Sequence, residues 1–356
     1  MPTISLKQPD GSSISVGVTL DEVLDWFRRG SGSGDQYLNY DFSYIAAQYG
    51  DLPWIRAHVN GHALEVPYTL VHDYRKHPSA SWGIGNIGES YHFPAQLLAH
   101  RRSMVDRFTK EGRLFKKGDS LCPRVASFDV AASDEPLFQL ERAWYTDQVG
   151  TNLTLDFPLS KPITVAAIEC RTAREWDQAS GIGRKEGLPE FSTSRLANTI
   201  GVSIGVTCRT KTGEPALLRR SRAKNVAVYA GMWASPFAFA LALPKEISDG
   251  PHNMRDIISW DLGVEFAEEL ALDTSEFTEP RPVAFCRDVV RGGKPQFFFE
   301  MSTDVPFEDI ATRLGKKNSE YTGRVSVVDS ADNASHPKVS PELACFIALH
   351  AQELSA

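Results

Sequence analysis

GPHNMRDIISWDLGVEFAEELAL, residues 250–272, is the stretch of this sequence that decides the fold. Its glutamates Glu265, Glu268 and Glu269 stand at spacings i, i+3 and i+4, which place them on one face of an α-helix. Asp261 lies one turn earlier and extends the same acidic stripe. The stretch therefore predicts a helix with carboxylates gathered along one side.

An apolar edge runs beside these carboxylates. Leu262, Phe266 and Leu270 recur every fourth residue, a spacing typical of a helix that packs against a core. Carboxylates this close repel one another unless a cation lies among them. Clusters of oxygen ligands suit Mg²⁺ or Mn²⁺, which often share their coordination shell with substrate phosphates. The alternative is an ordinary helix whose acidic side faces water.

The spacing along this stretch carries a family resemblance. Gly250 is followed by five residues, Asp256, seven residues and then Val264 with the three glutamates, and the stretch closes on Leu272. This resembles the Nudix box of the Nudix hydrolase family, G-x5-E-x7-R-E-U-x-E-E-x-G-U, where U is a bulky aliphatic residue. Asp256, Val264 and Ala271 stand where the family pattern has glutamate, arginine and glycine.

The chain on either side of the box is compatible with this resemblance. Residues 198–209 alternate as a strand, a turn follows at 211–215, and the chain returns over 216–219. Trp233 then leads an apolar segment, expected as one strand over 234–243, to the loop before the box. The resemblance covers about 195–356 and is specific only within 198–273.

The resemblance implies an α/β fold in the form of an α/β/α sandwich around a mixed sheet. We expect this Nudix-like domain to span residues 126–356. Residues 1–125 are expected to form an N-terminal accessory α+β region that serves as a substrate-selecting cap or as the dimerisation arm of a homodimer.

The resemblance also implies a reaction. Nudix enzymes hydrolyse a nucleoside diphosphate linked to a further group, using Mg²⁺ or Mn²⁺ to neutralise the diphosphate and activate water. Carried over position by position, Glu265, Glu268 and Glu269 would hold the metal, with one of them acting as general base. Asp256 would contribute from the periphery, and Glu320 is our expectation for the glutamate that a later loop supplies in such sites.

A basic turn and a tryptophan precede the box. Arg219, Arg220 and Arg222 are candidates to bind the substrate phosphates, because the guanidinium group matches phosphate geometry. The alternative for them is a solvated hairpin edge. Trp233 would stack on the base of the substrate or belong to the core.

Val264 keeps two functional classes open. In the family pattern an arginine at this position is ion-paired to the first helix glutamate, and valine cannot form that pair. The chain is therefore either an active metal-dependent hydrolase or a catalytically inactive Nudix-fold module that binds a related ligand or regulates a partner.

Composition narrows the partners. The net charge of −7 over 356 residues argues against nucleic acid or an anionic membrane as the main partner. Five scattered cysteines without a CxxC pair argue against a zinc or disulfide framework, and we see neither a transmembrane run nor a secretory signal. We therefore expect a cytoplasmic protein that acts on a small nucleotide-type diphosphate.

Three local patterns complete the expectations. The GxGxxG at 83–88 lacks a preceding buried strand and is interpreted as a glycine loop, not a dinucleotide site. TVAAIEC, residues 164–170, is expected as one strand. Thr303 and Asp304, with Pro306 behind them, are expected to open a helix that ends near Leu314.

Overall fold

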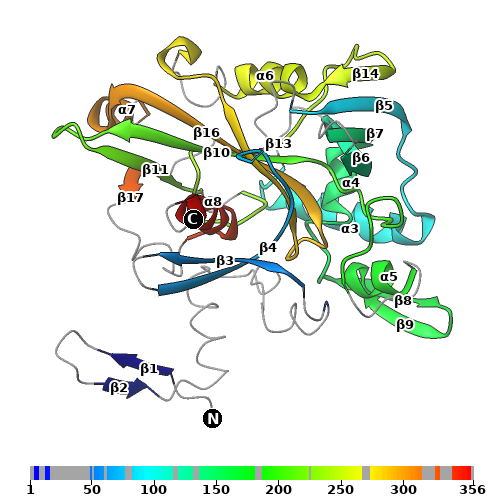
Figure 1. Ribbon diagram of the computed structural model, residues 1–356. Coiled ribbons are helices and arrows are strands. Elements are labelled where there is room, and N and C mark those ends of the chain that lie inside the picture. The colour runs from blue at the N-terminus through cyan, green and yellow to red at the C-terminus, as the bar shows by residue number, and fades with distance from the viewer. Residues whose placement is uncertain are drawn as a thin grey trace.

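The computed structural model describes residues 4–7, 13–16, 49, 52–59, 62–76, 82–114, 119–130, 136–180, 187–223, 226–266, 273–314, 325–328 and 339–353. Its centre is a nine-stranded mixed sheet with the path β12-β11-β10-β16-β15-β4-β3, to which β13 adds at β10 and β17 at β11 (Figure 1). The strands β10 and β16 run parallel, whereas the other neighbouring pairs are antiparallel. The bounds of these strands are β3 Trp54–Val59, β4 His62–Asp73, β10 Gly201–Arg209, β11 Pro215–Ser221, β12 Trp233–Ala234, β13 Phe237–Ala240, β15 Arg281–Asp288, β16 Lys294–Pro306 and β17 Val325–Val328.

A second sheet of four strands packs beside the first, in the order β14-β5-β7-β6. Two further strand pairs form separate hairpins, β1 with β2 and β8 with β9. The bounds are β1 Ile4–Lys7, β2 Ser13–Val16, β5 Ile84–Ser90, β6 Leu121–Val130, β7 Pro136–Trp144, β8 Pro158–Val165, β9 Ile168–Thr172 and β14 Gly250–Asn253.

Helices cover the sheets from different sides. In Figure 1 the C-terminal helix α8 lies under one face of the nine-stranded sheet and α6 lies above the other. None of the helices within the described residues has the length and apolar character needed to cross a membrane. The helical segments are η1 Ala95–Leu97, α3 Leu98–Lys110, α4 Tyr145–Val149, α5 Ala173–Ser180, α6 Met254–Glu265, η3 Thr274–Glu276, α7 Phe307–Leu314 and α8 Pro341–Glu353.

The large sheet has an apolar core on each side. On the α6 side, ring centroids of Phe285 and Phe297 lie 4.7 Å apart, and Phe138 of the second sheet contacts Phe285 at 5.2 Å. On the α8 side, Phe298 packs with helix residues such as Leu343. Because β15 and β16 are buried on both faces, the central parts of their sequences are nearly continuous runs of apolar residues.

The mixed α/β class expected from the sequence is confirmed. A difference lies on the α6 side, where the second sheet shares the apolar core with α6 and α7. The expected boundary at residue 125 falls inside β6, and β3 and β4 precede it in the chain while belonging to the nine-stranded sheet.

Four local expectations were wrong, because each rested on neighbouring residues alone. The glycine-rich segment after Trp82 is the strand β5, where Gly85 lets Leu140 and Met254 pack closely, within 2.8 Å of where a Cβ would stand. The segment 164–170 is a hairpin turn, because Ala166 and Ala167 take the left-handed conformation that glycine usually supplies.

The third concerns the end of β16. This strand continues through Pro306, and α7 begins only at Phe307, so Thr303 does not open the helix. The fourth is the single strand expected over 234–243, which is divided into β12 and β13 with two residues between them.

Helix α6 tolerates a methyl group at its one internal glycine. Asn253 caps the helix by accepting a hydrogen bond from the backbone N–H of Arg255 at 2.8 Å. Gly263 is exposed, and a Cβ there would meet nothing within 4 Å. We expect Gly263→Ala to raise the free energy of unfolding by about 0.5–1 kcal/mol, because alanine favours the helix. Urea denaturation measures the change.

A matched control for this variant is Gly213→Ala in the turn between β10 and β11. The space beside Gly213 is equally open, but its φ is +84°. Alanine there should lower the free energy of unfolding by about 1 kcal/mol. If both variants shifted stability in the same direction, helix propensity would not be the cause.

Candidate functional site

Helix α6 buries one of its acids, and a second acid follows on the same side. Met254, Ile258 and Asp261 are buried along one side of the helix, and Glu265 follows one turn after Asp261 on that side. Asp256 is exposed. It lies nine positions before Glu265, which at about 100° per residue puts the two on opposite sides of the helix. The helix therefore brings Asp261 and Glu265 together but not Asp256.

Asp261 is held in the interior, with only 3% of its surface exposed. Its Oδ2 accepts a hydrogen bond from the backbone N–H of Ala242 at 2.8 Å, just beyond β13. Burial raises the pKa of Asp261 to about 7, and the hydrogen bond from Ala242 only partly opposes this. This acid thus ties α6 to the chain that leaves β13.

The other expected metal ligands are only partly visible. Glu265 is half-buried at the end of α6. Glu268, Glu269 and Glu320 lie outside the described residues. Within the described part of the chain, no group of three His, Cys, Asp or Glu residues comes together as a metal site. Glu268 and Glu269 would have to complete any cation site that Glu265 and Asp261 begin.

The expected phosphate-binding residues lie mainly on the opposite side of the large sheet. The guanidinium of Arg219 stacks over the ring of Trp233 at 3.7 Å and donates to Ser326 Oγ at 2.8 Å. Trp233 packs against the apolar core between the large sheet and α8. Arg222 pairs with Glu342 of α8 at 2.7 Å.

Arg220 is buried, and it lies on the other face of the large sheet from Arg219. Leu218 belongs to the core on the α6 side, and alternation along β11 places Arg220 on that side too. The sheet therefore separates Arg219, Arg222 and Trp233 from the acids of α6, so these expected site residues do not form one site.

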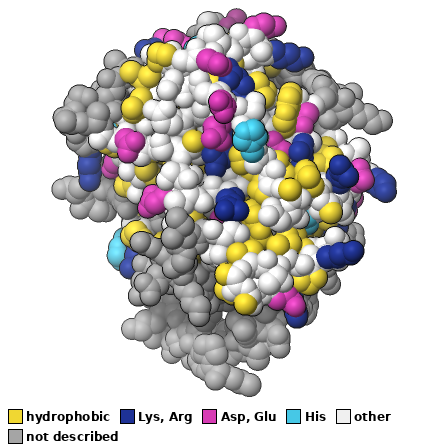
Figure 2. Space-filling model, turned by 90° about the vertical axis from the view of Figure 1, so that its right-hand side faces the viewer, with side chains coloured by type: hydrophobic (Ala, Val, Ile, Leu, Met, Phe, Trp, Pro, Cys, Tyr) yellow, Lys and Arg dark blue, Asp and Glu magenta, His cyan; other side chains and the backbone are white. Residues whose placement is uncertain are grey.

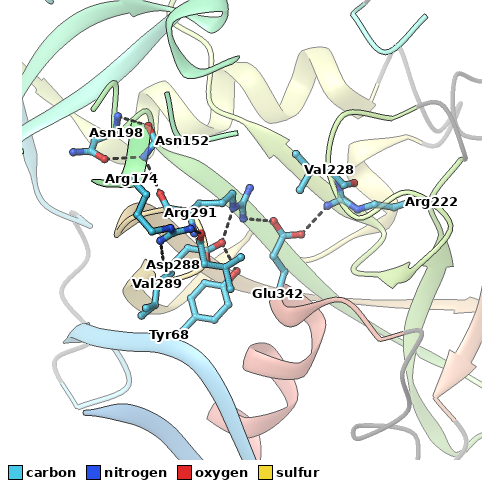
Figure 3. Close-up of polar contacts among 11 residues, drawn as sticks. Tyr68, Asn152, Arg174, Asn198, Arg222, Val228, Asp288, Val289, Arg291 and Glu342 are labelled. Atoms are coloured by element: carbon cyan, nitrogen blue, oxygen red, sulfur yellow. Dashed lines mark hydrogen bonds and ion pairs between the residues drawn. The ribbon is translucent and has the colours of Figure 1, made fainter. Parts of the chain in front are cut away.

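A buried charge cluster lies under the N-terminal end of α8 and consists of Arg222, Asp288, Arg291, Lys294 and Glu342. Figure 3 shows Arg291 between the two carboxylates, with Arg222 reaching Glu342 from the other side. Arg291 Nε lies 2.6 Å from Asp288 Oδ2, and its Nη2 lies 2.7 Å from Glu342 Oε1. Arg291, Asp288, Lys294 and Glu342 are each at most 4% exposed.

Both carboxylates of the cluster are fully engaged. Asp288 Oδ2 also accepts from the Tyr68 hydroxyl at 3.0 Å, and its Oδ1 accepts from the backbone N–H of Arg291 at 3.2 Å. Glu342 gives one oxygen to Arg291 and the other to Arg222. Although burial raises the pKa of Glu342, these two arginines lower it below its ordinary value.

Lys294 is the cation of the cluster for which no carboxylate remains. No described residue forms a hydrogen bond or ion pair with its Nζ, and the residue is 1% exposed. Burial, together with the nearby charge of Arg291, lowers the pKa of Lys294 to about 7 against the opposing effect of Glu342 and Asp288. Buried groups with pKa values moved towards neutrality are candidates for function.

By sequence alone, this part of the chain indicates no more than a hairpin turn between two apolar strands. The run Arg291-Gly292-Gly293-Lys294 joins β15 to β16, and both glycines take positive φ values, +69° and +81°. A local signal was present, because two basic residues bracket the glycine pair between two strongly apolar strands. Such strands predict burial for the charges that flank them.

The face at the right of Figure 1 offers a contrast to this cluster. Figure 2 shows basic and acidic side chains intermingled with hydrophobic ones across it. Charges of both signs interspersed in this way are typical of an ordinary solvated surface.

No protein-family model matches the chain, and no curated protein matches it. Among solved structures, it is similar to a Nudix hydrolase from M. Smegmatis, RenU, with 13% identity and a TM-score of 0.27 over 44% of this chain and 84% of that chain. It is also similar to a chain in the complex between the C-terminal domain of mouse MUTYH and human PCNA, with 9% identity and a TM-score of 0.25 over 44% of this chain and 90% of that chain. Both likenesses are distant and concern the fold alone.

Proposed function

We propose that this protein is a Mg²⁺- or Mn²⁺-dependent hydrolase that cleaves the diphosphate bond of a nucleoside diphosphate linked to a further group. The observation that carries the proposal is the orientation of α6. Asp261 is buried, and Glu265, one turn later on the same side, is half-buried, whereas a solvated surface helix would turn both acids to water.

The proposed roles follow from this orientation. Glu265, together with Glu268 and Glu269 of the adjoining sequence, would hold the cation, which supplies charge neutralisation and an activated water. Asp261 fixes the helix against the residues after β13 through Ala242. Ordering of the helix by such contacts keeps its carboxylates in a constant direction.

The first test is Glu265→Gln in an assay that follows release of nucleoside monophosphate from a panel of nucleotide sugars and dinucleotides. The wild type is expected to act only with Mg²⁺ or Mn²⁺. The variant should lose at least about 100-fold in turnover, because the amide neither holds the cation as well nor accepts a proton. Glu268→Gln and Glu269→Gln are expected to behave alike.

Glu214→Gln is the matched control for this experiment. Glu214 is exposed in the turn between β10 and β11, and the same change of charge there should leave turnover as it is. Turnover that persists in EDTA, or a Glu265→Gln variant as active as wild type, would contradict the proposal.

A second candidate is a catalytically inactive Nudix-fold module that binds a ligand of the same class. It is favoured by Val264, which is 37% exposed and carries no group that can ion-pair with Glu265. This candidate predicts that nucleotides raise the melting temperature equally with EDTA and in Glu265→Gln. A Val264→Arg variant that gained turnover would show that the residue at this position limits catalysis.

A further inference from the structure

Two cysteine side chains meet between the large sheet and α8. Cys286 belongs to β15 and Cys345 to α8, and both are part of the apolar core on the α8 side. The side chain of Cys286 forms a hydrogen bond with that of Cys345, and both residues are 0% exposed. The two cysteines are 59 positions apart in the sequence, so only the folded chain brings them together.

The buried charge cluster joins the same two elements beside these thiols. Cys286 and Asp288 are two residues apart in β15 and project from one face of the strand. Glu342 and Cys345 are three residues apart in α8 and share one side of the helix. Arg291 bridges the two carboxylates, at 2.6 Å from Asp288 and 2.7 Å from Glu342. These ion pairs therefore keep the thiol of α8 next to the thiol of β15.

The other three cysteines are dispersed over different strands. Each donates its S–H to a backbone carbonyl at 3.6–3.7 Å, and they are Cys122 of β6, Cys170 of β9 and Cys208 of β10. All five cysteines of the chain lie within described residues and carry free thiols. The contact between α8 and β15 therefore distinguishes one pair of thiols from the rest.

We propose that Cys286 and Cys345 are a thiol–disulfide pair, and that their oxidation by a small-molecule disulfide of the glutathione class joins α8 covalently to the large sheet. The thiolate of one cysteine attacks a sulfur of the small disulfide, which forms a mixed disulfide and releases one small thiol. The thiolate of the other cysteine then attacks the protein sulfur of that mixed disulfide. This second step forms the bond between Cys286 and Cys345 and releases the second small thiol. Two protein thiols are thus oxidised, the small disulfide is reduced, and the two protons pass to the leaving thiolates.

Burial determines when this exchange takes place. Burial raises the pKa of Cys345 well above its ordinary value, so the folded protein keeps this thiol protonated and away from solvent. The exchange therefore occurs while α8 is detached from the sheet, during folding or local opening, and redocking of α8 selects the partner. The finished disulfide is buried and shielded from external thiols. The pair thus records the redox conditions under which α8 last docked.

The experiment refolds the full chain from urea at about pH 8, where free thiols ionise, with either reduced or oxidised glutathione. Remaining thiols are then alkylated and counted by mass spectrometry. Wild type from the oxidising buffer should carry three alkylated cysteines instead of five, with a peptide that links Cys286 to Cys345. Its melting temperature should lie at least about 4 °C above that of the reduced protein, because the closed loop restricts the unfolded chain.

Cys286→Ala and Cys345→Ala each remove one partner and should abolish both the linked peptide and the difference in melting temperature between the two buffers. Cys170→Ala is the matched control, because Cys170 is likewise 0% exposed but lies on β9, and this variant should keep both effects. Each variant is compared with itself in the two buffers, so the cost of losing a buried sulfur cancels.

The proposal is overturned if wild type from the oxidising buffer keeps five free thiols or links a different pair of cysteines. It is equally overturned if the linked protein melts at the temperature of the reduced one, or if Cys286→Ala shows the same rise as wild type. The linked peptide is measured on wild type, so the test stands even where circular dichroism shows a variant to be unfolded. The pair requires neither a metal ion nor the acids of α6, so its result is independent of the proposed hydrolase activity.

Discussion

Glu342→Gln is expected to lower the free energy of unfolding by about 3–5 kcal/mol, which is the usual cost of breaking a buried ion pair from one side. Glu342 receives Arg291 on one carboxylate oxygen and Arg222 on the other, each at 2.7 Å. Glutamine offers one acceptor oxygen and turns an N–H donor towards the second guanidinium. One buried arginine is then left without a counter-ion.

The same ion pairs make the free energy of unfolding depend on pH in the acidic range. Burial raises the pKa of Glu342, but the charges of Arg222 and Arg291 lower it by more than burial raises it. The folded pKa therefore lies below the ordinary value of 4.5. A depressed carboxyl pKa stabilises the folded state above the unfolded pKa, and this contribution is lost as the pH falls below it. Glu342→Gln should therefore flatten the loss of stability below about pH 4.5.

Asp304→Asn is the matched control for Glu342→Gln. Asp304 also pairs with an arginine, Arg209 at 3.1 Å, but its side chain is 93% exposed. Its replacement should change the free energy of unfolding by less than about 1 kcal/mol. Equal effects of the two variants in urea denaturation would show that burial does not decide the strength of these pairs.

Local patterns were sufficient for much of this fold. The part of the acidic helix over Met254–Glu265 and the strands β10 and β11 could be predicted, because periodicity and caps are properties of neighbouring residues. The same locality explains the failures. Nothing near Ala166 signals a turn, and the strand character of β5 depends on Leu140 and Met254, which are distant in sequence.

The buried charge cluster could not be predicted for the same reason. Arg222 and Glu342 are separated by 120 residues, and Tyr68 and Asp288 by 220. Single-sequence patterns indicate that arginines are present but not which face of a sheet they occupy. Arg219 and Arg222 were therefore expected beside the acids of α6, whereas the large sheet separates both arginines from that helix.

Lys294→Met is expected to raise the free energy of unfolding at pH 7 by about 1–4 kcal/mol, as replacement of unfavourably buried charge by an apolar side chain often does. Burial lowers the folded pKa of Lys294 to about 7, against an ordinary value of 10.5. Between these values the unfolded chain binds a proton that the folded protein does not. Wild-type stability should therefore rise with pH by about 1.4 kcal/mol per unit from this group.

The measurement is the difference between wild type and Lys294→Met in urea denaturation from pH 7 to 8.5. Effects of other ionisable groups are common to both proteins and cancel in the difference. Lys294→Arg supplies the opposite control, because arginine stays charged and should be less stable than wild type throughout. Parallel pH curves for wild type and Lys294→Met would mean that Lys294 does not titrate in this range.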